Sequence, residues 1–376
     1  MRGALDGIVV ADFSRVLAGP YATMMLADLG ARVIKVERPG AGDDTRAWGP
    51  PFAPDGQSTY FHSVNRNKES VALDLKDPDD RQEAWALATT CDVMIENFLP
   101  GAMSRMGLGY DEVAVANPSI VYCSISGFGS GAGAGLPGYD LLVQAMGGLM
   151  SITGPDVENP SKVGVALVDV LTGLHAAVGI LAALHHRDVT GEGQYLEVSL
   201  MRTILSSLVN QASGYVLAGQ VPTSMGNAHP SIAPYEVYQA ADRPLVLAVG
   251  NDGQFSALMQ ALGASELAED PRFASNPARV ENRRALNDLV NAALASHDAD
   301  HWQSALNAVG VPCGPINSVA QAFQLAESLG LAPISDIADP RRVHVTHTVS
   351  NPIDLHGTPV TYRSAPSRVG EDSLHD

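Results

Sequence analysis

Residues 162–200 decide the fold of this chain, and they read KVGVALVDVLTGLHAAVGILAALHHRDVTGEGQYLEVSL. Val163–Val168 is a short apolar run typical of a buried strand, and Leu171–Leu184 is a longer apolar segment that predicts a helix. The basic tripeptide HHR follows this segment and favours a helix C-terminus. Gln194–Leu200 then alternates polar and apolar residues. The stretch therefore predicts a strand, a helix and a second strand.

Asp169 stands where the first predicted strand meets the helix, and two interpretations of it are open. Asp is a common helix N-cap, and removing such a cap costs about 1 kcal/mol. Alternatively, Asp169 is a nucleophile, because active sites collect at the carboxyl ends of strands in α/β folds. Backbone N–H groups and the helix dipole would then keep its carboxylate ionised at neutral pH, ready to attack an acyl group.

Composition limits the class of protein. The chain has 376 residues, a formal net charge of -18 and a pI near 4.9, which excludes nucleic acid or an anionic membrane as a partner of the whole protein. Its three cysteines lie far apart and show no metal-ligand spacing, so we expect reduced thiols, no metal and a cytoplasmic protein. The start MRGALDGIVVADF is not a signal peptide, and the apolar stretch 174–184 is too short to span a bilayer.

The first third of the chain predicts a parallel sheet. Strands at 7–13 and 32–37 flank a helix at 20–29, which makes a βαβ unit with a right-handed crossover. The turn FSRVLAG lacks the glycine fingerprint of a dinucleotide site, so NAD is not expected. Further strands are expected at 70–75, 93–96 and 119–125, with helices at 80–90, 141–149 and 202–217.

The character of the chain changes near residue 220. A strand is expected at 244–250, a short edge segment at 311–316, and helices at 254–262, 283–294, 299–309 and 318–329. We therefore predict an α/β fold with a Rossmann-like parallel-sheet large domain over 1–219. A smaller α/β domain covers 220–329, and a C-terminal segment, 330–376, returns to the large domain.

Two loops suggest ligand binding. The basic turn around Arg66 and Lys68 follows a long Gly/Pro loop at 39–57, and in so acidic a chain it hints at phosphate binding. The glycine-dense segment GFGSGAGAG at 127–135 follows a strand but is followed by LPG and not by a helix. It therefore favours a flexible active-site loop over a dinucleotide fingerprint.

Six segments together resemble the family III CoA-transferases, also called the CaiB/BaiF group, which includes formyl-CoA transferase and the carnitine and benzylsuccinate CoA-transferases. In chain order they are LDGIVVADFSRVLAGPYATMMLADLGARVIKVERPGAGDDTR, FHSVNRNKESVALDLK, ENFLPGAMSRMGLGY, SISGFGSGAGAGLPGYD, ALVDVLTGLHAAVGILAALHHRDVTGEGQ and GNAHPSIAPYEVY. The resemblance covers nearly the whole chain. It implies acyl-CoA and a small carboxylic acid as substrates, coenzyme A as the group carrier, and an obligate, interlocked homodimer.

The resemblance also implies a mechanism and a set of site residues. Asp169, in ALVDVLTG, matches the family's nucleophile, which passes through a mixed anhydride and an aspartyl-CoA thioester. Oxyanion donors are expected from the helix N-terminus after Asp169 or from the loop at 226–229. The family's CoA-contacting positions fall on Val16, Leu17, Ala18, Arg38, Leu73, Lys76, Asn97, Phe98, Leu99, Arg105, Gly138 and Tyr139. Its substrate-loop positions fall on Asp140, Gly226, Asn227 and His229.

Two other functions stay open at this point. The α-methylacyl-CoA racemases resemble the chain throughout but carry a GHD motif where this chain has Gly138-Tyr139-Asp140. Tyr has a reference pKa of about 10 and is a poor base at neutral pH, which favours a transferase. The third possibility is a non-catalytic CoA- or nucleotide-binding protein, which the presence of Asp169 disfavours.

Overall fold

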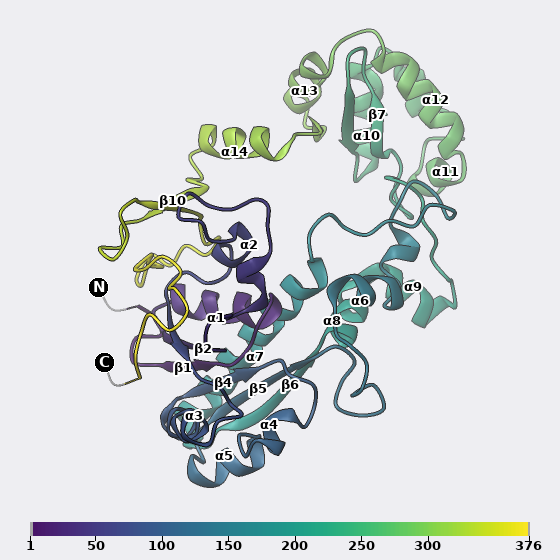
Figure 1. Ribbon diagram of the computed structural model, residues 1–376. Helices are drawn as coiled ribbons and strands as arrows, with labels where there is room; N and C mark the ends of the chain where they lie inside the picture. The colour runs from purple at the N-terminus through teal and green to yellow at the C-terminus, as the bar shows by residue number, and fades with distance from the viewer. Residues whose placement is uncertain (1–2, 375–376) are drawn as a thin grey trace. The chain divides into compact units, whose positions relative to one another are not determined.

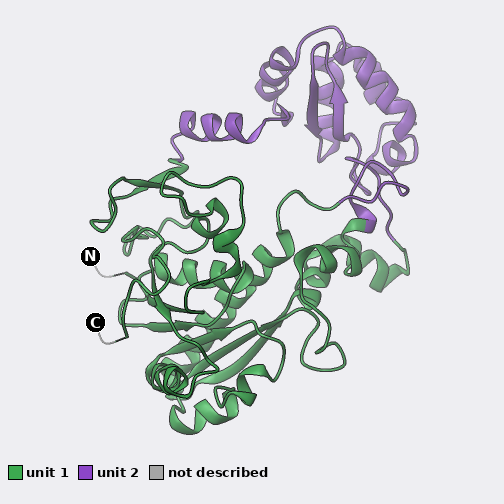
Figure 2. Ribbon diagram, viewed as in Figure 1, with its two compact units in different colours: residues 1–150, 162–221, 332–376 green, residues 151–161, 222–331 purple. Residues whose placement is uncertain are grey.

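The computed structural model describes residues 3–374, and the chain folds into two compact units, drawn in green and purple in Figure 2. The first unit holds the chain up to Met150, residues Lys162–Val221 and the chain from Ala332 onward. The second unit holds Ser151–Ser161 and Pro222–Leu331. Residues 151–161, predicted in the first domain, thus belong to the second unit, where the Gly154 carbonyl accepts a hydrogen bond from the Ser224 hydroxyl at 2.5 Å.

A parallel β-sheet forms the centre of the first unit, with its strands in the order β3-β2-β1-β4-β5-β6. Because the strands are parallel, their carboxyl ends lie at one edge, and in doubly wound folds ligands bind there at the point where the strand order reverses, here between β1 and β4. The predicted parallel-sheet α/β fold is confirmed, with small shifts at the strand ends. The strands are β1 (Val9–Asp12), β2 (Arg32–Glu37), β3 (Lys68–Ala72), β4 (Val93–Glu96), β5 (Val121–Ser126) and β6 (Gln194–Ser199).

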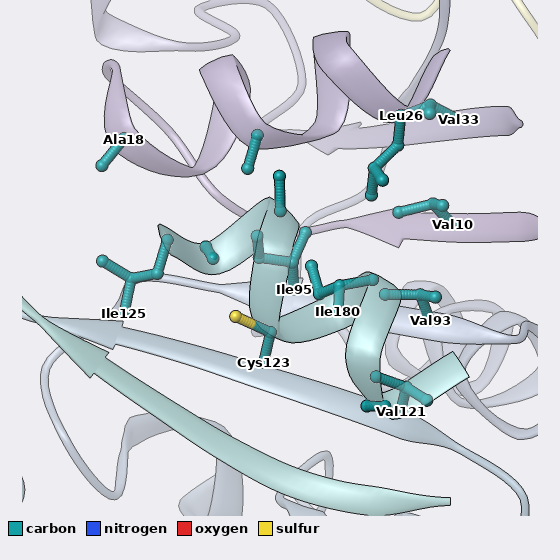
Figure 3. Close-up of a cluster of buried hydrophobic side chains, with 14 of the residues drawn as sticks. Val10, Ala18, Leu26, Val33, Val93, Ile95, Val121, Cys123, Ile125 and Ile180 are labelled. Carbon is teal, nitrogen blue, oxygen red and sulfur yellow. The ribbon is translucent and has the colours of Figure 1, made fainter. Parts of the chain in front are cut away.

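Helices cover both faces of this sheet (Figure 1). On one face, α1 (Ala18–Asp28) and α7 (Leu167–Thr190) pack over a core that includes Cys123 of β5 and Ile180 of α7 (Figure 3). On the other face, α3 (Pro78–Thr90) and α5 (Tyr110–Ala116) pack over Tyr122. Neighbouring residues of β5 serve opposite faces because side chains alternate along a strand. Burial on both faces explains why these strands are continuous apolar runs in the sequence.

Helix α7 is longer than predicted, and the strand predicted at 163–168 is wrong. Residues 163–166 are irregular, and the Val163 N–H donates to Gln144 Oε1 at 2.9 Å. The helix begins at Leu167 and continues to Thr190. Hydrophobic periodicity does not distinguish a short buried strand from a segment that leads into a buried helix, so the apolar run at 163–168 was compatible with both. Asp169 therefore lies in the first turn of α7.

Among the helices of residues 3–374, α7 is long and apolar enough to cross a membrane by length and composition alone. Half of its most apolar window is buried, and Ala176, Ala177 and Ile180 pack in the core of the first unit. A helix that is apolar on most sides is also typical of the interior of a globular domain. The buried side of α7 thus belongs to the core of this unit.

The other elements of the first unit are short. One helix predicted at 202–217 is divided in two near Val209, whose φ of 45° lies outside the right-handed helical region. β10 (Ile334–Ile337) and β11 (Thr346–Val349) pair antiparallel. The remaining helices are α2 (Thr59–His62), α4 (Ala102–Arg105), α6 (Asp140–Met146), α8 (Leu200–Ser207) and α9 (Val209–Ala218). Within residues 3–374 there are also three 3₁₀ helices: η1 (Asp44–Ala47), η2 (Met150–Ile152) and, in the second unit, η3 (Ser265–Ala268).

The second unit has an antiparallel sheet in the order β7-β8-β9 with its own core. The prolines of 311–316 led to the prediction of an edge segment, and β9 is indeed at the edge. The elements are β7 (Tyr235–Gln239), β8 (Pro244–Ala248), β9 (Cys313–Pro315), α10 (Asp252–Ala261), α11 (Asn276–Glu281), α12 (Arg283–Leu294), α13 (Ala299–Ala308) and α14 (Val319–Ser328). Of these helices, only α11 was not predicted.

Candidate active site

A cavity of about 310 Å³ lies at the carboxyl edge of the sheet in the first unit. It is lined by the loops that follow β1, β4 and β5 and by Asp169 from the first turn of α7. This is the edge at which ligands bind in open α/β sheets. The cavity therefore brings together three loops far apart in the sequence and the carboxylate that the sequence singled out.

The Asp169 carboxyl group is partly buried, and its pKa is raised to about 7. Burial is the larger cause, and the negative charge of Asp140 is the second. The helix N-terminus therefore does not lower the pKa of this carboxyl group, contrary to the prediction. At pH 7 about half of the molecules carry the ionised form that a nucleophile requires.

Asp140 explains why the helix N-terminus does not stabilise Asp169. Asp140 Oδ1 accepts hydrogen bonds from the N–H groups of Val168, at 2.8 Å, and Asp169, at 3.2 Å. Ala166, at the N-cap position, has no side-chain acceptor, so a residue of α6 performs the capping. These two N–H groups are occupied by Asp140 and are not free to act as oxyanion donors, whereas donation from the helix N-terminus after Asp169 stays a prediction.

A buried hydrogen-bonded chain holds Asp140 in place. Its Oδ2 accepts from Gln144 Nε2 at 2.6 Å, and Gln144 is completely buried. Gln144 Oε1 in turn accepts from the Val163 N–H. The chain thus connects α6 to both ends of the segment that leads into α7, and it fixes the position of Asp169.

The loop after β1 enters the cavity in a strained conformation. Val16 has a φ of 71°, which is rare for a β-branched residue and costs on the order of 1–3 kcal/mol. The Asp43 carboxylate accepts from the Val16 N–H at 3.2 Å and pairs with the buried Lys35 ammonium at 2.9 Å. Lys35 also donates to the Ser14 carbonyl at 2.8 Å. A buried ion pair therefore holds the loop in the form that lines the cavity.

The glycine-dense loop lies along the cavity and is closed at its base by two glycines. A Cβ on Gly138 would lie 2.7 Å from the Gly127 Cα, so neither position accepts a side chain. Ser130 anchors the middle of the loop by donating from its N–H and its hydroxyl to the Glu197 carboxylate, at 3.0 and 2.7 Å. The predicted active-site loop thus lines the site, as Gly127, Gly129 and Gly133 show.

Comparison with known proteins identifies the family of the chain. Residues 5–373 match the sequence pattern of CoA-transferase family III. The chain belongs to this family. It is therefore an enzyme that transfers coenzyme A, as the sequence predicted, and it is similar to characterised CoA-transferases over most of its length.

Three relatives illustrate how closely the chain follows the family. It is 42% identical over 375 residues to the succinate–glutarate CoA-transferase of Agrobacterium fabrum, covering 98% of this chain and 93% of that protein. It is 44% identical over 329 residues to the acetyl-CoA:oxalate CoA-transferase of Acetobacter aceti, covering 87% and 84%. The crystal structure of a CaiB/BaiF family protein from Brucella suis superposes with a TM-score of 0.86 at 41% identity, covering 99% and 97%.

Most of the predicted family III site residues of the first unit line the cavity. These are Val16, Leu17, Ala18, Asn97, Phe98, Leu99, Gly138, Tyr139 and Asp169. Four predicted CoA contacts do not line it: Arg38, Leu73, Lys76 and Arg105. Arg38, Lys76 and Arg105 are exposed, whereas Leu73 is 4% exposed and packs in the core under α3, which leaves its side chain unavailable to a ligand. Gly226, Asn227 and His229 belong to the second unit.

The basic turn predicted to bind phosphate has a structural role instead. Arg66 is buried and pairs with the Asp28 carboxylate at 2.6 Å, and Asp28 also accepts from Asn67 and Asn351, each at 2.8 Å. Lys68 is buried beside Asp12, and burial lowers the pKa of Lys68 to about 8. Both cations are used inside the protein, so the phosphate interpretation of this turn is wrong.

Sequence reasoning missed Arg15, Asp44 and Tyr60. Arg15 and Asp44 line the cavity, and they pair at 3.2 Å. Burial and the negative charges of Asp169 and Asp140 raise the pKa of Tyr60 to about 12. The signal for Arg15 was present in FSRVLAG, where a basic residue stands three residues after the end of the first strand.

Metal chemistry has no candidate ligand set in the part of the chain that the structure describes. Within residues 3–374, no group of three or more His, Cys, Asp or Glu side chains is arranged to hold an ion.

Proposed function

We propose that this enzyme moves CoA from an acyl-CoA donor to a free carboxylic acid through covalent intermediates on Asp169. One observation carries the proposal. The Asp169 carboxylate lines the cavity together with the loops after β1, β4 and β5, and within residues 3–374 it has no cationic partner. Hydrogen bonds and nearby cations lower a carboxyl pKa and reduce its reactivity toward carbonyls. A carboxylate deprived of both is suited to nucleophilic attack.

The proposed reaction exchanges one thioester for another and needs no external energy. An Asp169 oxygen attacks the donor thioester carbonyl, the C–S bond breaks, and CoA leaves as a thiolate with an acyl-aspartyl anhydride left behind. The thiolate then attacks the aspartyl carbonyl, which releases the donor acid as a carboxylate and forms an aspartyl-CoA thioester. The acceptor carboxylate repeats these two steps in reverse and leaves as its CoA thioester.

The residues around the cavity position these reactants. The strained loop at 16–18 and the turn at 97–99 are proposed to contact CoA, because both line the cavity that holds Asp169. Gly138 leaves the main chain bare beside the cavity, which allows close approach of a slender pantetheine arm. Oxyanion donors for the tetrahedral steps must come from groups other than the Val168 and Asp169 N–H groups, which Asp140 occupies.

The relatives suggest the acceptor class. Succinate, glutarate and oxalate, which the names of the Agrobacterium fabrum and Acetobacter aceti enzymes carry, are all small dicarboxylic acids. We extend this class to the present enzyme and propose a small dicarboxylic acid as its acceptor.

We also propose that the enzyme is an obligate homodimer of the interlocked type implied by the family. In support, α7 exposes Leu174, Val178 and Leu181, which recur at helical spacing on one face. In α9, Val216 and Leu217 are 75% and 85% exposed. Apolar surface of this extent usually contacts another chain. Sedimentation at assay concentration should show a dimer, and an active monomer would contradict this proposal.

A trapping experiment tests the chemistry. The enzyme is incubated with an acyl-CoA panel, quenched with hydroxylamine, digested and analysed by mass spectrometry for a hydroxamate on the peptide that holds Asp169. We expect a substrate-dependent hydroxamate at Asp169 that is absent from Asp169→Ala. Deuterium exchange at the α-carbon with an intact thioester and no adduct would instead indicate a racemase.

A further inference from the structure

We propose that Arg15 binds the second carboxylate of the acceptor and thereby selects dicarboxylic over monocarboxylic acids. This inference rests on the proposed transfer at Asp169 and adds the residue that recognises the part of the acceptor that does not react. Its basis is the charge of the cavity wall. Three charged side chains line the cavity, namely Asp169, Asp44 and Arg15, so Arg15 is the one cation among the lining residues.

Arg15 keeps a net positive charge although it is paired with Asp44. Its Nη1 donates to Asp44 Oδ2 at 3.2 Å, but Asp44 Oδ1 also accepts from Arg38 Nη2 at 3.0 Å. Two guanidinium groups thus share one carboxylate, which leaves an excess of one positive charge. In residues 3–374 the Nε and Nη2 of Arg15 have no hydrogen-bond partner, and the side chain is 49% exposed. The free donors can therefore take up an anionic oxygen.

The position of Arg15 is fixed before any ligand binds. The Asn97 side chain holds the main chain of Arg15 from both sides: its Oδ1 accepts from the Arg15 N–H at 2.9 Å, and its Nδ2 donates to the Arg15 carbonyl at 2.7 Å. The guanidinium carbon lies 5.7 Å from the centre of the Phe98 ring, within cation–π range. A preorganised guanidinium loses little conformational freedom when it forms a bidentate pair, which increases discrimination.

An anionic oxygen could come from a carboxylate of the acceptor or from a phosphate of CoA, and the geometry favours the carboxylate. Arg15 lines the same cavity as Asp169, where the acyl group must lie. Arg38 contacts the other oxygen of Asp44 and does not line the cavity. Arg38 is therefore better placed than Arg15 to bind a phosphate outside the cavity. A monocarboxylic acid of equal length would place a methyl group at Arg15 and leave the guanidinium without an anion.

The test compares glutarate with pentanoate, which differ only in a carboxylate against a methyl group at the far end. Values of kcat/KM for each acceptor, with one fixed acyl-CoA donor, are measured for the wild-type enzyme, Arg15→Leu, Arg15→Lys and the control Arg38→Leu. A charge-assisted pair should give the wild-type enzyme a preference for glutarate of roughly 10- to 100-fold. Arg15→Leu should abolish this preference, and Arg15→Lys should retain part of it because the charge remains without the fork.

The control separates the two sources of anion. Arg38→Leu removes a guanidinium from the same carboxylate, so it should leave the ratio of glutarate to pentanoate unchanged even if it raises KM for the donor. The proposal is overturned if Arg15→Leu lowers kcat/KM for both acceptors equally, which would assign Arg15 to CoA, or if the wild-type enzyme shows no preference. Absence of transfer and of any Asp169 adduct in the wild-type enzyme would overturn the proposed function itself. If Arg15→Leu does not fold, the ratio for Arg15→Lys decides.

Discussion

Replacing Asp140 by Asn should make Asp169 a stronger acid, and the structure sets the size of the change. The pKa of Asp169 lies at about 7, against an ordinary 3.8, and burial contributes more than the charge of Asp140. Less than half of this difference of roughly 3 belongs to Asp140, so its neutralisation should lower the pKa to no less than about 5.5. Asn keeps an oxygen that accepts from the N–H groups of α7, so the helix cap is preserved.

The assay is the pH dependence of adduct formation at Asp169 with limiting acyl-CoA, measured by rapid quench. In the proposed mechanism the ionised carboxylate is the nucleophile, so the rate should rise with pH and level off above the pKa. The midpoint of this rise is expected near pH 7 in the wild-type enzyme and near pH 5.5 to 6 in Asp140→Asn. At pH 6 the ionised fraction should increase by up to about eightfold.

Gln144→Leu provides the matched control. It removes the buried partner of Asp140 without changing any charge, so it should destabilise the segment before α7 but leave the midpoint near pH 7. If Asp140→Asn kept the wild-type midpoint, or if Gln144→Leu moved it equally, the charge of Asp140 would not control the nucleophile. The raised pKa of Asp169 would then have another cause than the charge of Asp140.

Three other changes test separate parts of the structure. Asp169→Asn should raise the melting temperature more at pH 8 than at pH 5. The pKa of Asp169 is higher in the folded than in the unfolded protein, so the unfolded carboxyl ionises first and the wild-type enzyme loses stability progressively from about pH 4 to pH 7. An equal rise in melting temperature at both pH values would contradict the raised pKa. Gly138→Ala should abolish adduct formation, because its Cβ would lie 2.7 Å from the Gly127 Cα, whereas Gly131→Ala, with nothing within 4 Å, should retain it. Arg66→Met should cost about 3–5 kcal/mol of unfolding free energy in a denaturant titration, because it leaves a buried carboxylate unpaired, and KM for acyl-CoA should not change; a raised KM would restore the phosphate interpretation.

The sheet could be predicted from the sequence because each of its strands carries its own signal. Segments such as RVIKVE at 32–37 and VMIE at 93–96 are short apolar runs between turn residues, and both coincide with observed strands. The run at 163–168 has the same appearance but leads into α7. What distinguishes it is the pairing of its main chain with Gln144, a contact that no local pattern contains.

Apart from the positions that the family resemblance supplied, Asp169 was the residue of the site that the sequence itself identified. Asp169 is conspicuous in the sequence as a single charge in an apolar stretch, and its place beside the cavity follows from the fold. Arg66 and Lys68 are equally conspicuous, yet their partners Asp28 and Asp12 lie 38 and 56 residues away, and these partners turn both cations into structural ones. Charge in a sequence identifies candidates, but the partner decides whether the charge is free for a ligand.

Asp140 and Asp169 show how the partner of a charged residue, which the sequence does not reveal, affects function. A helix N-terminus stabilises whichever carboxylate its N–H groups reach, and from the sequence Asp169 was the nearest. In the structure the N–H groups of Val168 and Asp169 bind Asp140, 29 residues earlier, and Asp169 is left in a partly buried position beside a like charge. The Asp140 carboxylate thus accepts from the stabilising donors, while the ionised form of Asp169 is poorly stabilised, as the proposed attack requires. The feature that suits Asp169 to the proposed attack is therefore a property of the pair, and a change at Asp140, a residue that does not line the cavity, should alter the chemistry at Asp169.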